Sequence, residues 1–188
     1  VDIANSSKEE LSRMMVGRDV QLQVDKKPAN PGEVVLDVEN VTMHSAQHKK
    51  DAVRNVSFQV HAGEIVCLAG IEGNGQTELA ECVAGMRPVM GGSVTLCGRD
   101  VTGQTPGRIR EAGLSYIPED RISTGMDVKA SVAENLIVGK QRTPAFSRLG
   151  IHLRRGQVKK YAQELTRTFD IRTSGVDEPA GSLSGGNM

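Results

Sequence analysis

Hydrophobic and polar residues alternate along two neighbouring stretches, VVLDVENVTM and AVRNVSFQV, which begin at Val34 and Ala52. Alternation with a period of two predicts strands that bury one face, and in the second stretch that face carries Val56, Phe58 and Val60. After a turn at HAGE, the stretch EIVCLAG is almost continuously apolar. Such a run predicts a strand that is buried on both faces.

A glycine-rich loop separates this run from TELAECVAGMR, in which Leu79, Val83 and Met86 recur at helical spacing. Farther along, GGSVTLCGRDV predicts a hairpin-like pair of strands, and TPGRIREAG predicts a short helix that opens at a proline. LSYIPEDR predicts a strand that runs into a loop. The order of strand, glycine loop and helix is the context that a phosphate-binding loop requires.

The C-terminal third of the sequence is predicted to be mostly helical. SVAENLIVG contains the spacing of a capping box, from Ser131 to Glu134. RRGQVKKYAQELTRTFDI is the clearest helix of the chain, and EPAGSLSGGNM is a loop. The apolar face of that helix comprises Val158, Tyr161, Ala162, Leu165 and Phe169. Its paired basic residues, Arg154–Arg155 and Lys159–Lys160, are expected to form a solvated face.

The first residues predict a separate short helix. SSKEELSRMMVG has capping-box spacing from Ser6 to Glu9 or from Ser7 to Glu10, and Gly17 can end the helix. VDKKPANPGE then combines two prolines and several charges with no periodicity, which is typical of a linker. Residues 1–18 are therefore expected to be the tail of a preceding module, with a linker at 19–33 and a second module at 34–188.

Composition excludes some classes of protein. The chain has 23 basic and 23 acidic residues, so no global field draws it to nucleic acid or to an anionic membrane. Its apolar runs are too short to span a bilayer. Cys67, Cys82 and Cys97 match neither a disulfide framework nor a zinc pattern, so buried, reduced thiols are expected.

The loop GIEGNGQTEL fits the phosphate-loop pattern G-x-x-x-x-G-K-[ST] from Gly70 to Thr77, except that Gln76 replaces the lysine. Backbone N–H groups and the start of a helix can bind phosphates without that lysine, and a threonine hydroxyl can bind Mg²⁺. The predicted nucleotide-binding residues are Gly70, Gly73, Asn74, Gly75, Gln76, Thr77 and Glu78.

With glutamine in place of lysine, this loop lacks one full positive charge. A neutral donor in place of a charged one loses about 1–2 kcal/mol, or roughly tenfold in affinity, and Glu72 and Glu78 add repulsion. A glycine turn without any ligand remains the alternative at this point. A dinucleotide fingerprint is excluded, since it would require glycine where Glu78 stands.

The motif LSGGN at residues 183–187, about a hundred residues after the glycine loop, resembles the LSGGQ signature of the ATP-binding subunits of ABC transporters. VGRDV resembles the end of a first nucleotide-binding domain in the fused ATPases of the sugar- and nucleoside-importing subfamily, and residues 35–79 resemble the start of their second. YIPEDR stands at the Q-loop position, with Glu119 in place of glutamine. GNGQTEL is more similar to the nucleoside branch than to the ribose and galactose branch.

The resemblance implies an α/β fold, the P-loop NTPase fold of ABC type in partial form. Its parts would be an antiparallel β subdomain, the P-loop core strand and helix, and a helical subdomain at about residues 122–180. The later core strands, with the Walker B acids and the switch histidine, would lie outside this sequence. Residues 1–18 would then be the tail of the first nucleotide-binding domain. Without the Walker B strand, EIVCLAG would expose an apolar edge.

The resemblance also implies ATP and Mg²⁺ as cofactors and hydrolysis coupled to import as the activity. Thr77 and Glu119 would contact the metal, although no complete set of catalytic residues is present. The signature residues would face an ATP held by the first nucleotide-binding domain of the same polypeptide; they are Leu183, Ser184, Gly185, Gly186 and Asn187. Permease subunits and, indirectly, a periplasmic or lipoprotein substrate-binding protein would be partners at the cytoplasmic face of the membrane, without nucleic acid.

Several readings remain open. The family usually stacks an aromatic residue on adenine, and here His44 or His48 is the candidate, while their H-x-x-x-H spacing is too sparse for a metal site. The chain is either part of a hydrolysing ATPase or a non-catalytic regulatory module that only completes a partner's ATP site. A P-loop kinase is a weaker third reading, because of Gln76 and the signature motif.

Overall fold

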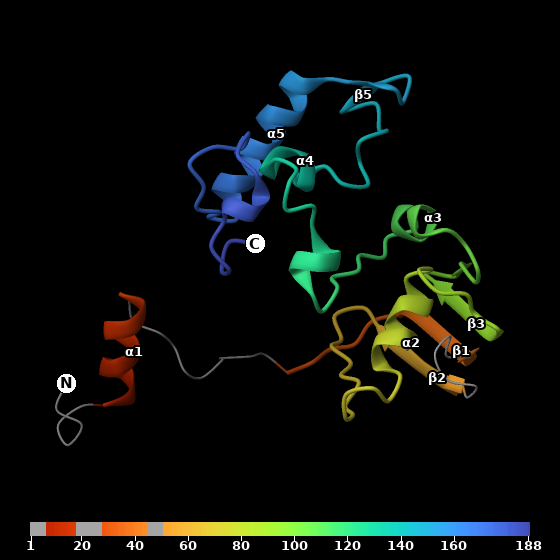
Figure 1. Cartoon of the computed structure of the whole chain (residues 1–188). Coiled ribbons are helices and arrows are strands. Elements are labelled where there is room, and N and C mark those ends of the chain that lie inside the picture. The colour runs from red at the N-terminus through yellow and green to blue at the C-terminus, as the bar shows by residue number, and fades with distance from the viewer. Residues whose placement is uncertain (1–6, 18–27, 45–50) are drawn as a thin grey trace.

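The computed structural model describes residues 7–17, 28–44 and 51–188, and these residues form two hydrophobic cores with a separate N-terminal helix (Figure 1). That helix, α1 (Lys8–Val16), begins at Ser7, whose Oγ accepts a hydrogen bond from the backbone N–H of Glu10 at 3.1 Å. It ends at Gly17 in the left-handed conformation, φ 76°. The predicted N-cap at Ser7 and the predicted end at Gly17 are confirmed, although Ser7 and Glu10 form only one of the two hydrogen bonds of a capping box. Residues 18–27, which hold most of the predicted linker, lie outside the described part.

The first core is built on a four-stranded antiparallel sheet in the order β2-β1-β3-β4. Its strands are β1 (Val34–His44), β2 (Asp51–His61), β3 (Gly91–Leu96) and β4 (Arg99–Asp100). The predicted alternation is confirmed, with irregularities where Asn40 and Asn55 take positive φ angles of 51° and 50°. The Oγ of Ser57 accepts a hydrogen bond from the N–H of Asn40 at 2.8 Å and holds this irregularity in place.

Helix α2 (Gln76–Val83) packs against this sheet, and α3 (Pro106–Glu111) lies beside it (Figure 1). Helix α2 buries Leu79, Cys82 and Val83 against it, and α3 contributes Ile109, which is 1% exposed. The predicted helices are therefore confirmed. Met86 lies beyond the end of α2 and is half exposed, so its assignment to the apolar face was wrong.

The run EIVCLAG does not form a strand, contrary to the expectation from its composition. Ile65 is 86% exposed, and Val66, Leu68 and Ile71 are exposed as well. A strand that is apolar on both faces needs neighbours to satisfy its backbone groups and cover its side chains, and no described strand pairs with this run. LSYIPEDR also forms no strand, and its Ile117 is 90% exposed.

The second core lies in the C-terminal part, where α4 (Val132–Leu136) packs against α5 (Arg155–Thr168). Between them runs a small hairpin, β5 (Ser147–Arg148) and β6 (His152–Leu153). The buried residues of this core are Ala133, Ile137, Phe146, Val158, Ala162 and Val176. Val158 and Ala162 of the predicted apolar face of α5 are thus confirmed as buried residues. Phe169, however, is 68% exposed and lines a cavity of about 280 Å³ with Ile171 and Leu183.

The capping box at α4 is present as predicted. Ser131 Oγ accepts a hydrogen bond from the N–H of Glu134 at 3.2 Å, and the Glu134 carboxylate accepts one from the Ser131 N–H at 2.8 Å. These bonds, first the one from the backbone and then the one from the hydroxyl of Ser131, lower the pKa of Glu134. The capping box fixes the start of α4, the first helix of the second core.

Substituting Ser131→Ala should lower the free energy of unfolding by about 1 kcal/mol, because the N–H of Glu134 loses its intramolecular acceptor. Thermal or urea denaturation followed by circular dichroism measures the loss. Ser115→Ala, at an exposed position outside the capped helices, is the matched control and should change stability by less than about 0.5 kcal/mol. Equal losses in the two variants would contradict the importance of the cap.

The cysteines only partly follow the expectation. Cys82 is buried, and burial raises the pKa of its thiol, so it is the inert core residue that was predicted. Cys67 and Cys97 are exposed, and the prediction for them was wrong. Cys67 lies in the unpaired run at 64–70, and Cys97, φ 48°, occupies the turn between β3 and β4. Within the described residues, no helix is long and apolar enough to cross a bilayer.

Candidate nucleotide site

The glycine loop leads directly into α2, as the sequence predicts. Gly73 and Gly75 have positive φ angles of 83° and 97°, and Gly75 is the N-cap of α2. A Cβ added to Gly75 would lie 2.2 Å from the carbonyl oxygen of Ala52 at the start of β2. Only glycine fits there, since both the backbone conformation and the close approach exclude a side chain. The first N–H groups of α2 are left for a ligand or water, because an α-helix cannot satisfy them internally.

Gln76 turns back over the loop that precedes it. Its Nε2 lies 1.9 Å from the position that a Cβ on Gly70 would take, and it donates a hydrogen bond to the carbonyl oxygen of Ile71 at 3.4 Å. The side chain that replaces the usual lysine is thus neutral and directed at its own loop. A side chain at position 70 would displace the flexible end of Gln76 from this position.

Thr77 and Glu119 lie in contact, although they are 42 residues apart in the sequence. The Thr77 hydroxyl donates a hydrogen bond to the Glu119 carboxylate at 2.5 Å. A hydroxyl and a carboxylate are hard oxygen ligands, which suit Mg²⁺ when phosphate and water complete its coordination. Among the described residues, no group of three or more His, Cys, Asp or Glu side chains could hold a metal ion by itself. The pair therefore fits a magnesium ion that arrives with a nucleotide.

Asp120, next to Glu119, has a different role. Its carboxylate accepts hydrogen bonds from the N–H groups of Ile122 and Ser123 at 2.8 and 3.0 Å and from the Ser123 hydroxyl at 2.6 Å. These bonds, the one from the Ser123 hydroxyl first, lower the pKa of Asp120. The carboxylate caps the turn at Arg121–Gly125, so it holds the loop in shape and is not free for a metal ion.

Arg121 brings this turn to the signature motif, a contact that sequence reasoning did not find. A Cβ added to Gly185 would lie 3.3 Å from Arg121 Nη2, so the guanidinium rests against this glycine. Arg121 forms no ion pair within the part of the chain that the structure describes. In the sequence, only the resemblance of YIPEDR to the family's Q-loop pointed to this segment, and it did not predict how close Arg121 lies to Gly185.

The signature motif follows a short 3-10 turn, Ala180–Ser182, and is anchored from both sides. The strand-like segment before it runs along the start of α4, where the Val132 N–H donates to Glu178 O at 2.9 Å and the Gly181 N–H donates to Val128 O at 2.9 Å. The Asn187 side chain accepts from the Arg172 N–H and donates to Ser184 Oγ, both at 2.8 Å. Asn187 therefore holds the loop closed from within.

The glycines of the signature motif are not required by the packing of this chain. A Cβ on Gly186 would meet nothing within 4 Å, and one on Gly185 would meet only the flexible end of Arg121. Ser184, Gly185 and Gly186 are all exposed. Small residues at an exposed, anchored loop leave its backbone open to close approach by a group from outside the chain.

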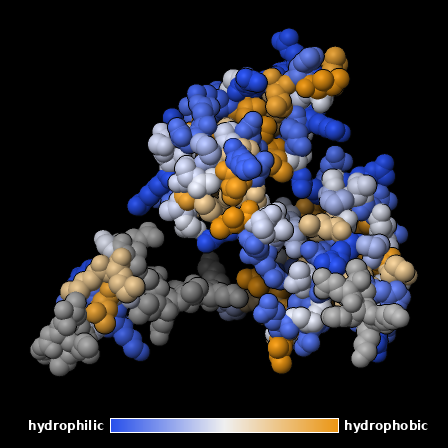
Figure 2. Space-filling view, viewed as in Figure 1, coloured by the Kyte–Doolittle hydropathy of each residue, from blue (hydrophilic) through white to orange (hydrophobic). Residues whose placement is uncertain are grey.

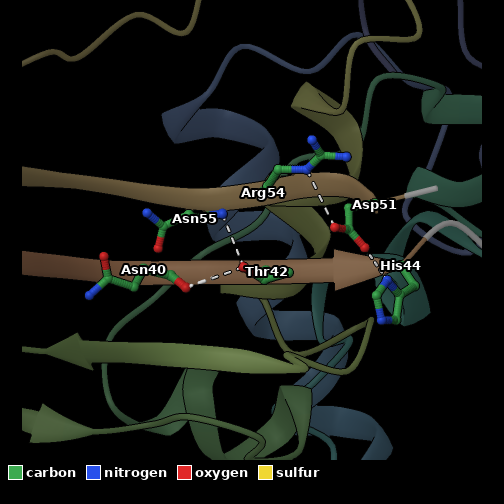
Figure 3. Close-up of polar contacts among 6 residues, drawn as sticks. All are labelled: Asn40, Thr42, His44, Asp51, Arg54 and Asn55. Atoms are coloured by element: carbon green, nitrogen blue, oxygen red, sulfur yellow. Dashed lines mark hydrogen bonds and ion pairs between the residues drawn. The ribbon is translucent and has the colours of Figure 1, made fainter.

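His44 lies at the end of β1, where its Nδ1 pairs with the Asp51 carboxylate (Figure 3). Asp51 also contacts Arg54 Nε at 3.4 Å, so it lies between the two side chains. The contact thus holds His44, at the end of β1, beside the start of β2. His48, the other candidate for stacking on a base, lies outside the described residues.

Comparison with known proteins identifies relatives of this chain. Residues 53–188 match the protein family described as "ABC transporter". The chain is 37% identical over 188 residues to the guanosine import ATP-binding protein NupO of Bacillus subtilis, and 40% identical over 192 residues to the glucose import ATP-binding protein TsgD13 of Haloferax volcanii. Both matches cover 100% of this chain but 36% and 34% of the relative. The chain therefore spans about a third of the length of the curated relatives it matches.

The fold has counterparts among solved structures. A nucleotide-free ATP-binding cassette from an ABC transporter superposes with a TM-score of 0.63 and 22% identity, over 83% of this chain and 61% of that one. A cassette in its ADP conformation, MJ1267, gives a TM-score of 0.62 and 21% identity over the same shares. These similarities confirm the P-loop fold, in the partial form expected from the sequence.

Proposed function

This chain belongs to the ABC transporter family, and on that premise we propose that it is part of the ATP-binding, energy-coupling component of an importer for nucleosides or simple sugars. The observation that carries the proposal is the contact between Thr77 and Glu119 beside a loop that only glycine can form at position 75. Two relatives are named for the import of guanosine and of glucose. The GNGQTEL loop favours a nucleoside as the imported molecule.

In this proposal the main chain, not a cationic side chain, holds the triphosphate. The N–H groups at the start of α2 and the positive end of its dipole face the phosphates. Thr77 and Glu119 would hold Mg²⁺, and the ion would supply positive charge to neutralise the phosphoryl group. Gln76 leaves the carbonyl of Ile71 and offers its amide to the phosphates. That neutral donor makes this the weaker of two sites.

The signature motif acts on a second ATP. Residues 34–188 form the first part of the second nucleotide-binding domain, residues 1–18 the end of the first, and residues 19–33 their linker. Ser184, Gly185 and Gly186 then face the ATP held by that first domain, while the helical part contacts permease subunits at the cytoplasmic face of the membrane. The exposed glycines, which this chain does not need for its own packing, support this arrangement.

A second candidate function is a non-catalytic module that binds nucleotide as a clasp and only completes the partner ATP site. The inward hydrogen bond of Gln76 favours it, because the loop satisfies this amide without a ligand. The two functions differ in whether ATP bound at this loop is hydrolysed.

Substituting Gln76→Lys in the full-length parent should raise nucleotide affinity at this loop about tenfold, since a charged hydrogen bond replaces a neutral one. Titration with a fluorescent ATP analogue measures the affinity, and phosphate release measures turnover. Gln76→Met removes the donor at similar length and should not bind more tightly than the parent. A rise in affinity without a rise in turnover would favour the clasp, and an unchanged affinity would contradict the electrostatic explanation.

A further inference from the structure

The hairpin of β5 and β6 exposes an apolar tip at the far end of the helical part (Figures 1 and 2). Leu149 is 93% exposed, Ile151 77% and Leu153 48%. Leu149 and Gly150 form the turn with φ angles of 54° and 73°. Leu149 and Ile151 lie in neighbouring positions of the hairpin, so together they form an apolar patch and not a single exposed residue.

Basic residues predominate in the sequence around this tip, and Glu134 and Asp177 line a separate cavity beside Leu153. Between Glu134 and Glu164 the sequence contains no Asp or Glu, although the whole chain is neutral. The same stretch holds the basic residues Lys140, Arg142, Arg148, Arg154, Arg155, Lys159 and Lys160. The segment from residue 135 to residue 163 therefore carries a net positive charge.

Three of these arginines share one concave surface with the tip. Arg142, Arg148 and Arg154 line a concavity of about 640 Å³ together with Pro144 and Leu149. None of the three forms an ion pair with any other described residue. By contrast, Lys159 pairs with Asp177 and Lys140 donates to the Tyr161 hydroxyl, and both are thereby engaged. The arginines at the tip are the free cations of this surface.

We propose that this hairpin surface, defined by residues 142–154, binds the anionic headgroups of a lipid bilayer while Leu149 and Ile151 enter the interfacial region. Apolar side chains flanked by arginine are the combination that holds a segment in a membrane interface, and each cation near an anionic leaflet strengthens the attraction. Single-stranded nucleic acid would instead favour several exposed aromatic rings for stacking; Phe146 is buried, and His152 is the one exposed aromatic side chain of this segment. The site is separate from the nucleotide loop, and its lipid contact would add to the permease contact proposed for the helical part.

Co-sedimentation of the full-length parent with vesicles tests the proposal. Vesicles of phosphatidylcholine with phosphatidylglycerol should bind the chain, and vesicles of phosphatidylcholine alone should bind it at least tenfold more weakly. Raising the salt from about 0.1 M to about 1 M should release it, because the screening length falls from about 10 Å to about 3 Å. Equal binding to both kinds of vesicle would overturn the proposal.

Matched variants locate the surface. Combining Arg148→Gln with Arg154→Gln should weaken binding at least tenfold, at about fivefold for each cation. Arg99→Gln with Arg108→Gln removes two exposed arginines elsewhere and should change binding less than twofold. Leu149→Ser should weaken binding about tenfold, whereas Ile117→Ser, at a site 90% exposed outside the hairpin, should not.

The remaining outcomes also decide the proposal. Circular dichroism shows that each variant keeps the parent's fold, so a loss of binding belongs to the surface. If the hairpin variants bind like the parent, or the control variants lose as much, the hairpin is not the site. Fluorescence anisotropy with a labelled oligonucleotide checks the competing class, and tighter binding to it than to the anionic vesicles would replace lipid with nucleic acid.

Discussion

Nucleotide binding at the glycine loop should fall at least 100-fold in Gly75→Ala. The added Cβ would lie 2.2 Å from the Ala52 carbonyl oxygen, and the residue would have to keep a φ of 97°. An L-residue in a left-handed conformation costs about 1–2 kcal/mol before any clash is counted. Because β2 is held in the sheet by β1, the loop must move and the N–H groups at the start of α2 must move with it.

Gly73→Ala is the matched control for this prediction. Gly73 has a similar φ, 83°, but a Cβ there would meet nothing within 4 Å. The Gly73→Ala variant should therefore lose about tenfold in nucleotide affinity, from the cost of the left-handed backbone conformation alone. Titration of a fluorescent ATP analogue into the full-length parent and both variants measures the difference. If the two variants bind alike, the contact with Ala52 does not shape the loop.

Hydrolysis at the partner site should fall about 100-fold or more in Gly186→Val, with little change in stability. A side chain at position 186 meets open space within this chain, so the domain keeps its fold. It would nevertheless separate the signature loop from an ATP held by the first domain, and a displacement of about 1 Å at a reacting group can cost about 100-fold in rate. The loss would therefore report a contact made in trans.

Phosphate release by the full-length parent measures this effect, together with thermal denaturation. Gly156→Val is the control, since Gly156 in the first turn of α5 also has nothing within 4 Å of an added Cβ. It should leave turnover within about twofold of the parent. Loss of turnover in Gly156→Val alone, or normal turnover in Gly186→Val, would argue against the trans role. Affinity at the Gln76 loop should be unchanged in both variants.

Local signals in the sequence determined much of the fold. Ser7 and Gly17 end α1, the Ser131–Glu134 box starts α4, and alternation gives β1 and β2. Each signal acts within a few residues, through capping bonds or through side chains on one face, so it can be read without the rest of the chain. The phosphate loop and the LSGGN motif are local signals too, because each is recognised from a few consecutive residues.

The tertiary structure alone decided what depends on distant partners. EIVCLAG has the composition of a core strand, yet it stays unpaired, because strand formation needs a neighbouring strand to bond with. The family resemblance had already put Thr77 and Glu119 at one metal ion, and the structure brings the two side chains into contact. The contact of Arg121 with Gly185 had no signal in the sequence and depends on the chain path between them. The sequence by itself determined which segments can fold and which chemistry they carry. Packing decided which of them meet, since contacts between remote residues depend on the whole path of the backbone between them.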